Sequence, residues 1–339
     1  MILVTGAAGY IGSHTTHQLV DEGQKVVCLD NFYSGFRWAI PPEAVLIEGS
    51  AGDSALVRKI IREYKVKSVI HFAGHIEVPE SVLNPLKYYE NNTSTSQRLL
   101  SVCMEEGVPR FVFSSTASVY GNAQDRPCDE KVLPSPINPY ARSKLATEQM
   151  IEDCYRSVEA RGLLPAEKHF SYVIFRYFNV AGARLDARIG QATPRATHLI
   201  KVACQAALGM RAGVQIYGTD YPTADGTGFR DYIHVEDLAA AHLLAVRYLE
   251  NGGTPRLLNC GYGHGFSVRQ VINQVKKVSG VNFDVHEGPR RFGDPASVVS
   301  DPSEVRKVLN WHPKYDDLEV ICRTAYEWEK KYKQISTSS

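Results

Sequence analysis

The sequence has 339 residues and lacks three things: an excess of one charge, long apolar runs and closely spaced cysteines. Lysine and arginine number 38 against 37 aspartates and glutamates, so the net charge is +1. This balance argues against nucleic acid or an anionic membrane as partner, because either would favour a basic excess. It leaves room for a small anionic ligand, which a few well-placed arginines can bind.

No apolar run comes near the length of about 18 residues that a transmembrane helix needs, so we expect none. The chain opens with an apolar strand pattern, Met1-Ile-Leu-Val-Thr5, and we expect no signal peptide. The seven cysteines are scattered, with no C-x-x-C pair. Their spacing fits a reduced, cytoplasmic compartment and argues against a zinc site, and we expect no bound metal.

What the first half does contain is a regular alternation of short apolar runs with helical patterns. Runs rich in Val, Ile and Phe are typical of strands buried on both faces of a parallel sheet, with helices on either side. The expected strands cover residues 2–5, 25–30, 45–48, 68–72, 110–114 and 171–177. The expected helices cover residues 12–22, 55–64 and 86–106, with a further long helix after Asn138-Pro139.

After about Asn179 glycine and proline become frequent, and the alternation fades. Helical patterns remain at residues 236–250, 267–278 and 317–333. The length, more than twice that of a typical domain, fits one large domain or two fused ones. We therefore expect a first domain over residues 1–179, to which later segments return, and a smaller, interleaved α/β lobe over residues 180–335. Residues 336–339 are expected to form a disordered tail.

A glycine-rich turn, Gly6-Ala-Ala-Gly9-Tyr-Ile-Gly12, joins the first expected strand to the first helix. Glycines at this spacing permit a tight turn and let backbone N–H groups approach a pyrophosphate at the helix N-terminus. Asp30 ends the next strand, where a carboxylate binds the adenosine ribose hydroxyls and repels a 2′-phosphate. The arrangement predicts a Rossmann-type, doubly wound sheet that binds NAD in preference to NADP.

Tyr140 and Lys144 are four residues apart, which places a phenol and an amine on one face of the long helix. A tyrosine is a poor base at its ordinary pKa of about 10, but a nearby ammonium favours the phenolate. Such a phenolate can take a proton from an alcohol while hydride leaves the carbon. Thr116 begins a polar loop at the carboxyl end of an expected strand, and is a candidate to pass that proton.

Taken together, T-G-x-x-G-Y-I-G-S, S-S-x-x-x-V-Y-G and Y-x-x-x-K resemble the motifs of the extended short-chain dehydrogenase/reductase family. Further stretches are similar to the narrower group of UDP-glucose 4-epimerases. These stretches are residues 71–74 (HFAG), 176–179 (RYFN), 218–235 and 290–294 (RRFGD). The similarity runs from Met1 to about Trp328 and so covers nearly the whole chain.

The resemblance implies an isomerase that interconverts UDP-galactose and UDP-glucose through a transient 4-keto sugar, with tightly bound NAD. It implies that Tyr140 is the base, that Lys144 tunes it, and that Thr116 joins the proton path. The positions that match the NAD site are Gly6, Gly9, Tyr10, Ile11, Gly12, Asp30, Asn31, Phe72, Ala73, Asn91, Ser114, Tyr140, Lys144 and Tyr177. The positions that match the UDP-sugar site are Thr116, Asn179, His198, Tyr217, Arg230, Arg291, Asp294 and Val298.

Four positions depart from the family pattern. Ser50 stands where an acid usually contacts adenine, and Ile76 where a lysine usually touches the nicotinamide ribose, so both bear on NAD affinity. His198 replaces a substrate-binding asparagine and is a candidate uridine contact. Val298 replaces a bulky tyrosine near the sugar, which predicts room for a 2-acetamido group.

Several alternatives share this chemistry. An epimerase of UDP-N-acetylhexosamine, UDP-pentose or UDP-uronate, or a decarboxylase, would oxidise the same carbon. A dehydratase also needs an acid and a base to expel water, and its usual Asp-Glu pair is Ala117-Ser118 here. A simple alcohol dehydrogenase would leave the UDP-type motifs without a purpose. A non-catalytic NAD-binding sensor or scaffold is the reading from a different class.

The resemblance also bears on assembly and pathway. Related enzymes are mostly homodimers paired through two long helices, which here would cover residues 86–106 and 140–161. Galactose use and polysaccharide supply are both open as the pathway served. Residues 156–169 form a segment longer than is usual in the family, and we assign it no function.

Overall fold

The computed structural model describes residues 1–122, 127–160, 170–193, 197–291 and 294–337. The chain divides into two compact units. Unit 1 comprises Met1–Val119, Pro134–Arg176 and Ala239–Leu258, and unit 2 comprises Tyr120–Leu133, Tyr177–Leu238 and Asn259–Ser339. Relative to the predicted boundary at Asn179, residues 120–133 and 177–179 thus belong to unit 2, and residues 239–258 belong to unit 1.

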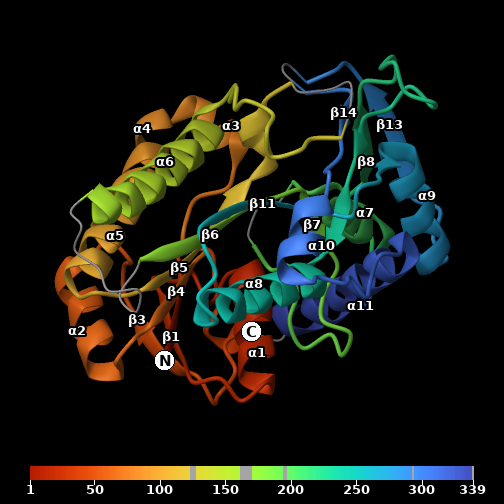
Figure 1. Ribbon diagram of the computed structural model, residues 1–339. Helices are drawn as coiled ribbons and strands as arrows, with labels where there is room; N and C mark the ends of the chain where they lie inside the picture. Colours follow the sequence, from red (N-terminus) through yellow and green to blue (C-terminus); the bar gives the residue numbers. More distant parts are fainter. Residues whose placement is uncertain (123–126, 161–169, 194–196, 292–293, 338–339) are drawn as a thin grey trace. The chain divides into compact units, whose positions relative to one another are not determined.

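Unit 1 is built on a seven-stranded sheet with the strand order β11-β6-β5-β4-β1-β2-β3 (Figure 1). Its strands are β1 (Ile2–Thr5), β2 (Val26–Asp30), β3 (Val45–Glu48), β4 (Ser68–His71), β5 (Arg110–Thr116), β6 (Ser171–Tyr177) and β11 (Arg256–Cys260). β1 pairs in parallel with both β2 and β4, and the parallel pairs β2–β3 and β4–β5 extend the sheet. This order is that of a doubly wound dinucleotide-binding sheet, which confirms the predicted fold class.

Helices cover both faces of this sheet. They are α1 (Tyr10–Asp21), α2 (Ser54–Tyr64), α3 (Val78–Leu83), α4 (Pro85–Tyr88), α5 (Thr95–Glu105), α6 (Pro139–Ala160) and most of α8 (Val235–Glu250). α2, α5 and α6 lie along one side of the sheet, and α1 and α8 along the other (Figure 1). Every residue of β1, β2 and β4 is buried as a result, which is why these strands appear in the sequence as near-continuous apolar runs.

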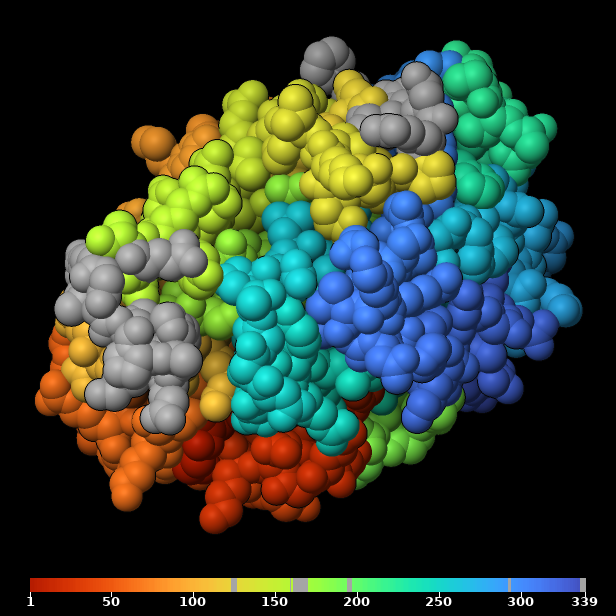
Figure 2. Space-filling model, in the orientation of Figure 1, coloured from red at the N-terminus to blue at the C-terminus, as the bar shows by residue number. Residues whose placement is uncertain are grey.

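The end of α8 is one of the parts of unit 1 that the space-filling view shows on the surface. The C-terminal end of α8 and the turn after it, residues 247–256, are mostly exposed. They lie on the face drawn in Figure 2, in cyan.

Two elements of unit 1 differ from their predicted bounds near the candidate site. β5 continues two residues past the predicted 110–114, so Thr116 ends a strand and does not begin a loop. The helix predicted over residues 86–106 is divided by a π-helical turn, Tyr89–Ser94. Within that turn the side-chain amide of Asn92 accepts the His75 N–H and donates to the His75 carbonyl oxygen. Such π-turns frequently occur at functional segments.

Unit 2 combines small sheets with helices. β8 (Gly213–Tyr217) pairs in parallel with β13 (Asp284–Gly288), and β7 (Asn179–Ala181) with β10 (Tyr232–His234). β9 (Phe229–Arg230) lies between β12 (Phe266–Ser267) and β14 (Ser297–Val298). The helices are α7 (Leu199–Ala207), α9 (Val268–Ser279), α10 (Ser303–Leu309) and α11 (Leu318–Thr337). The sequence did not predict α7 or α10, because short segments carry little periodicity.

The C-terminal helix is longer than predicted. α11 reaches Thr337, so it includes the first two residues of the segment expected to be disordered. The chain has no glycine or proline at that point to end the helix, and serine and threonine alone do not stop one. Ser338 and Ser339 lie outside the described residues.

In the described part of the chain, no helix combines the length and apolar character that a membrane span requires. All seven cysteines are free thiols, and only Cys154 among them is partly exposed. Within the same described ranges, no group of three His, Cys, Asp or Glu side chains is placed to hold a metal ion.

Candidate functional site

The glycine turn after β1 is packed so tightly that its glycines are required. Gly6 has a φ of +68°, and a Cβ built on it would lie 2.6 Å from the backbone nitrogen of Ala73. A Cβ on Gly12 would lie 2.2 Å from the carbonyl oxygen of Gly6. Since real atoms cannot approach this closely, larger residues at either position would displace the turn from β1 and α1.

The turn also prepares the N-terminus of α1 for an anion. Gly9 is the N-cap residue, and no described side chain caps this end of the helix. Tyr10 and Ile11 open the first turn, which carries no acidic residue. Backbone N–H groups and the helix dipole are therefore available to a diphosphate, and the residues present fit a dinucleotide.

Asp30 lies beside this turn at the end of β2. One carboxylate oxygen accepts the Ala8 N–H at 2.8 Å, and the other accepts the Phe32 N–H at 2.8 Å. Burial raises the pKa of the Asp30 carboxyl, and the two backbone hydrogen bonds oppose this effect. Asn31, the next predicted residue, is exposed, and its side chain accepts the Tyr33 N–H at 3.1 Å.

Lys144 is the centre of the candidate acid–base set. Its ammonium is buried, donates to the carbonyl oxygen of Ser114 at 2.9 Å, and lies 4.9 Å from the centre of the Phe113 ring. Burial lowers the pKa of Lys144 to about 8, and the negative charge of Glu148 opposes this. Tyr140, four residues earlier on α6, is 7% exposed.

Thr116 ends β5, the strand whose Ser114 carbonyl receives the Lys144 ammonium. The Thr116 hydroxyl accepts the Ser118 N–H at 3.1 Å. Ser114 presents its own hydroxyl to the His242 ring at 3.4 Å. The structure therefore places Thr116, Tyr140 and Lys144 in unit 1, on β5 and the helix that packs against it.

The other predicted cofactor residues are spread over the strand ends and the π-turn. Phe72 follows β4 and packs against the His242 ring with centroids 4.8 Å apart. Ala73, next in the chain, lies against Gly6. Asn91 donates its side-chain N–H to the Asn92 amide oxygen at 3.0 Å. Tyr177 is the first residue of a unit 2 segment.

Ser50 and Ile76 are the two cofactor-site positions that depart from the family pattern. The Ser50 hydroxyl accepts the Gly52 N–H at 3.1 Å. Asp53, its acidic neighbour, caps α2 by accepting the N–H groups of Ala55 and Leu56. Ile76 is 42% exposed. The effect of Ser50 and Ile76 on NAD affinity stays a prediction.

Unit 2 brings several of the predicted substrate residues into pairs. Arg230 on β9 stands opposite Val298 on β14 in the strand register. Its guanidinium also makes an ion pair with Asp294 at 3.4 Å. Arg291 stacks on Tyr217, with the guanidinium carbon 3.8 Å from the ring centre. Two cations and an acid thus belong to this unit, where a nucleotide with a charged diphosphate could bind them.

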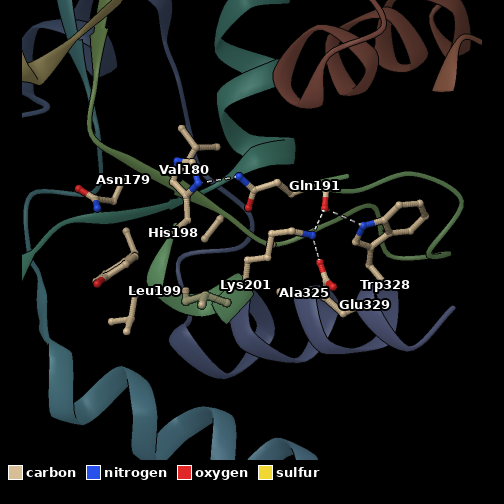
Figure 3. A pocket seen from close by; sticks show the side chains of 13 residues that line it. Asn179, Val180, Gln191, His198, Leu199, Lys201, Ala325, Trp328 and Glu329 are labelled. Atoms are coloured by element: carbon tan, nitrogen blue, oxygen red, sulfur yellow. Dashed lines mark hydrogen bonds and ion pairs between the residues drawn. The ribbon is translucent and has the colours of Figure 1, made fainter. Parts of the chain in front are cut away.

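A pocket in unit 2 is lined by two more of the predicted residues, Asn179 and His198 (Figure 3). The Gln191 amide N–H donates to the Nδ1 of His198 at 2.9 Å, which leaves the proton of a neutral ring on Nε2. Leu199, the first residue of α7, also lines the pocket.

The inner side of this pocket holds a buried ion pair that the sequence did not predict. Lys201 on α7 pairs with Glu329 on α11, and their side chains are 6% and 2% exposed. The Lys201 ammonium also donates to the Gln191 carbonyl oxygen at 2.6 Å, and the Trp328 indole N–H donates to the same oxygen at 3.2 Å (Figure 3). The pair therefore ties α7, α11 and the Gln191 loop together around the pocket.

Replacing Lys201 by Met is expected to lower the free energy of unfolding by about 3–5 kcal/mol, because Glu329 would remain buried without its cation. Denaturant unfolding measures this loss. The double change Lys201→Met with Glu329→Leu should recover most of it.

The matched control is Lys307→Met, which breaks an exposed pair with Glu304 whose side chains are 78% and 47% exposed. It should cost less than about 1 kcal/mol. Equal losses in Lys201→Met and Lys307→Met would contradict the role given to the buried pair.

Comparisons with known proteins agree with this arrangement. A model of the NAD dependent epimerase/dehydratase family matches residues 2–261. The UDP-glucose 4-epimerase of Azospirillum brasilense is 50% identical over 333 residues, which is 98% of this chain and 93% of that protein. The motifs that resembled this family in the sequence are therefore supported by similarity along almost the whole chain.

Two solved structures are similar throughout. The UDP-glucose 4-epimerase of Brucella ovis in complex with NAD has a TM-score of 0.90 at 39% identity, covering 96% of this chain and 97% of that one. The UDP-Glc/GlcNAc 4-epimerase of Campylobacter jejuni has a TM-score of 0.83 at 45% identity, covering 97% and 99%. With its sequence, strand order and glycine turn in agreement, the chain belongs to the NAD dependent epimerase/dehydratase family.

Proposed function

We propose that this protein is an isomerase that interconverts UDP-galactose and UDP-glucose by inverting the configuration at C4 of the sugar. The observation that carries the proposal is the buried Lys144 ammonium at the end of β5, with Tyr140 one helical turn before it. Lysine side chains are rarely buried unless polar partners hold them, because desolvating the charge is costly. The similarity to UDP-glucose 4-epimerases along nearly the whole chain supports the same function.

The proton chemistry belongs to Tyr140. An ammonium close to a phenol favours the phenolate, which can then accept the proton of the sugar 4-hydroxyl, directly or through Thr116. NAD, when bound, supplies the hydride acceptor for C4 and the donor for its return. Tyr140 gives the proton back when the 4-keto sugar is reduced on its opposite face, so the protein ends each turnover unchanged.

The glycine turn and Asp30 of unit 1 would hold NAD. The turn offers its backbone N–H groups to the diphosphate, and Asp30 offers its remaining lone pairs to the adenosine ribose. Because the cofactor is regenerated in each cycle, it does not need to dissociate between turnovers. Retention also makes the return of hydride a unimolecular step.

Unit 2 would hold the substrate through its nucleotide. The guanidinium groups of Arg230 and Arg291 suit the diphosphate, Asp294 suits a ribose hydroxyl, and Asn179, His198 and Tyr217 suit the uridine and sugar. Binding through UDP leaves the hexose free to turn. That freedom is necessary, because the 4-keto sugar must present its other face before reduction.

A wider substrate range is a second candidate, carried by Val298. A small residue beside Arg230 leaves space for a 2-acetamido group, and the similar Campylobacter jejuni structure is that of a UDP-Glc/GlcNAc 4-epimerase. UDP-pentoses and UDP-uronates fit the same C4 chemistry. A non-catalytic NAD-binding protein would need no buried Lys144, which makes that reading the weaker one.

We further propose that the enzyme works in the cytoplasm, in galactose metabolism, as a homodimer. Seven free thiols suit a reducing compartment. α5 and α6 are the helices that would pair two copies, as the resemblance implies. Analytical ultracentrifugation measures the assembly directly.

Purified protein with NAD and UDP-galactose is expected to form UDP-glucose. Tyr140→Phe should lower kcat by about 100-fold or more, because the proton acceptor is lost. Tyr326→Phe is the matched control, since Tyr326 and Lys330 form a second Tyr-x-x-x-Lys pair on α11 and should not matter. Failure of the wild-type protein to interconvert the two sugars would contradict the proposed function. Full activity in Tyr140→Phe would contradict the assigned base.

Gly12→Ala is expected to weaken NAD binding by about tenfold or more, because its Cβ would lie 2.2 Å from the Gly6 oxygen. Fluorescence titration of NADH measures the affinity. Gly23→Ala is the control: its φ is +74° with open space around it, so it should cost stability of about 1 kcal/mol and leave affinity unchanged. Equal NADH affinity in wild type and Gly12→Ala would refute the assignment of the turn.

Val298→Tyr is expected to reduce kcat/KM for UDP-N-acetylglucosamine by about tenfold or more, while kcat/KM for UDP-glucose changes by less than about threefold. The added ring would fill the space for the acetamido group. Val298→Thr keeps the side-chain volume and should preserve both activities. Negligible turnover of the acetamido sugar by the wild-type protein would show that Val298 does not provide this space.

A further inference from the structure

Helix α6 carries a third polar residue on the face of Tyr140 and Lys144. Glu148 follows Lys144 by four residues, so the three side chains lie one above another along the helix. Glu148 is nearly inaccessible, with 4% of its side chain exposed. A carboxylate in such a place requires partners that hold its charge.

Those partners come from two neighbouring strands of the sheet. Arg176 on β6, itself 5% exposed, grips both oxygens of Glu148, with Nη2 at 2.6 Å from one and Nε at 3.1 Å from the other. Ser115 on β5 donates its hydroxyl to the carboxylate. The bidentate ion pair and the hydroxyl together fix both the position and the orientation of the carboxylate.

Consecutive residues of β5 therefore bind successive turns of α6. Ser114 receives the Lys144 ammonium through its carbonyl oxygen, and Ser115 binds Glu148 through its hydroxyl. The next residue is Thr116, the hydroxyl proposed for the proton path. A shift of α6 along β5 would disturb all of these contacts together.

Glu148 also acts on Lys144 through its charge. Among the described residues, it is the charged group that opposes the lowering of the Lys144 pKa by burial. The other titratable or charged groups in this region are Tyr140 on α6, His71 on β4, which interacts with the Lys144 charge, Arg176 on β6, which pairs with Glu148, and His242 on α8, which meets the Ser114 hydroxyl. His71 contributes no cation near neutrality, because burial and then the Lys144 charge lower its pKa to about 3.

We propose that Glu148, held by Arg176 and Ser115, is a positioning residue for the acid–base set: it fixes Lys144 against β5 and keeps it an ammonium while Tyr140 exchanges its proton. The inference rests on the proposed function for its kinetic part only. Its electrostatic part concerns Lys144 in the resting protein.

The sign of the effect follows from the charges. A carboxylate raises the pKa of a nearby lysine, so removing its charge lowers the pKa of Lys144. Activity that needs the ammonium is present below this pKa and is lost above it. In Glu148→Gln, the loss of kcat with rising pH should therefore begin at a lower pH, by about one unit.

The first test needs no substrate. In protein labelled with ¹³C at the lysine ε carbons, NMR follows the titration of Lys144, assigned by its absence in Lys144→Met. Glu148→Gln should lower the midpoint by about one unit. Glu152→Gln, which breaks an exposed pair with Arg156 on the same helix, should leave it unchanged. An unshifted Lys144 midpoint in Glu148→Gln would overturn the proposal.

The second test is the pH profile of kcat with UDP-galactose. Glu148→Gln should move the basic limb downward by about one unit, which lowers kcat by about twofold at pH 7 and about tenfold at pH 9, with KM changed by less than about twofold. Equal losses in kcat and NAD affinity with an unmoved limb would indicate a structural role and overturn the proposal. If Glu148→Gln shifts the Lys144 midpoint while the wild-type protein does not interconvert the sugars, the proposed function is contradicted and the tuning of Lys144 is supported.

Glu148→Gln leaves the Arg176 charge buried, so a second variant guards against unfolding. Glu148→Gln with Arg176→Met removes both charges and should restore the stability lost in the single variant. Losing the carboxylate lowers the pKa of Lys144 while losing the Arg176 cation raises it, so the midpoint should lie above that of Glu148→Gln alone. Wild-type kcat and an unmoved basic limb in this double variant, which has no carboxylate to position Lys144, would overturn the proposal.

Discussion

The burial of one ammonium group, that of Lys144, is the constraint on which the organisation of unit 1 depends. Taking a lysine out of water is unfavourable unless its charge meets polar partners. Here the Ser114 carbonyl oxygen, the face of Phe113 and the negative charge of Glu148 supply them. Ser114 and Phe113 lie on β5 and Lys144 lies on α6, so these contacts hold α6 against the end of β5.

The start of α6 follows from the same constraint. Asn138 accepts the Ala141 N–H with its side chain at 2.9 Å, and Pro139 is the first residue of the helix. Both residues favour a helix that begins at this point. Tyr140 therefore falls in the first turn, and Lys144 and Glu148 in the turns above it. A start displaced by one residue would rotate all three away from β5 by about 100°.

The carboxyl ends of the parallel strands bring the remaining cofactor residues to one edge of the sheet. Gly6 follows β1, Asp30 ends β2, Phe72 follows β4 and Thr116 ends β5. Parallel strands all place their carboxyl ends on the same side, so residues distant in the sequence become neighbours without a dedicated interaction. In unit 2 side-chain pairs hold the candidate substrate residues: Arg230 makes an ion pair with Asp294, and Arg291 stacks on Tyr217. A net charge of +1 hides these local cations.

By itself the sequence determined the features whose signals are local. β1 and β6 have their predicted bounds, because strands buried on both faces are continuous apolar runs. The shared face of Tyr140 and Lys144 follows from the helical period alone. Only the tertiary structure decided the buried pairs, Glu148 with Arg176 and Lys201 with Glu329, whose members are 28 and 128 residues apart. No local pattern marks such partners, since each looks like an ordinary surface charge until the fold removes it from water.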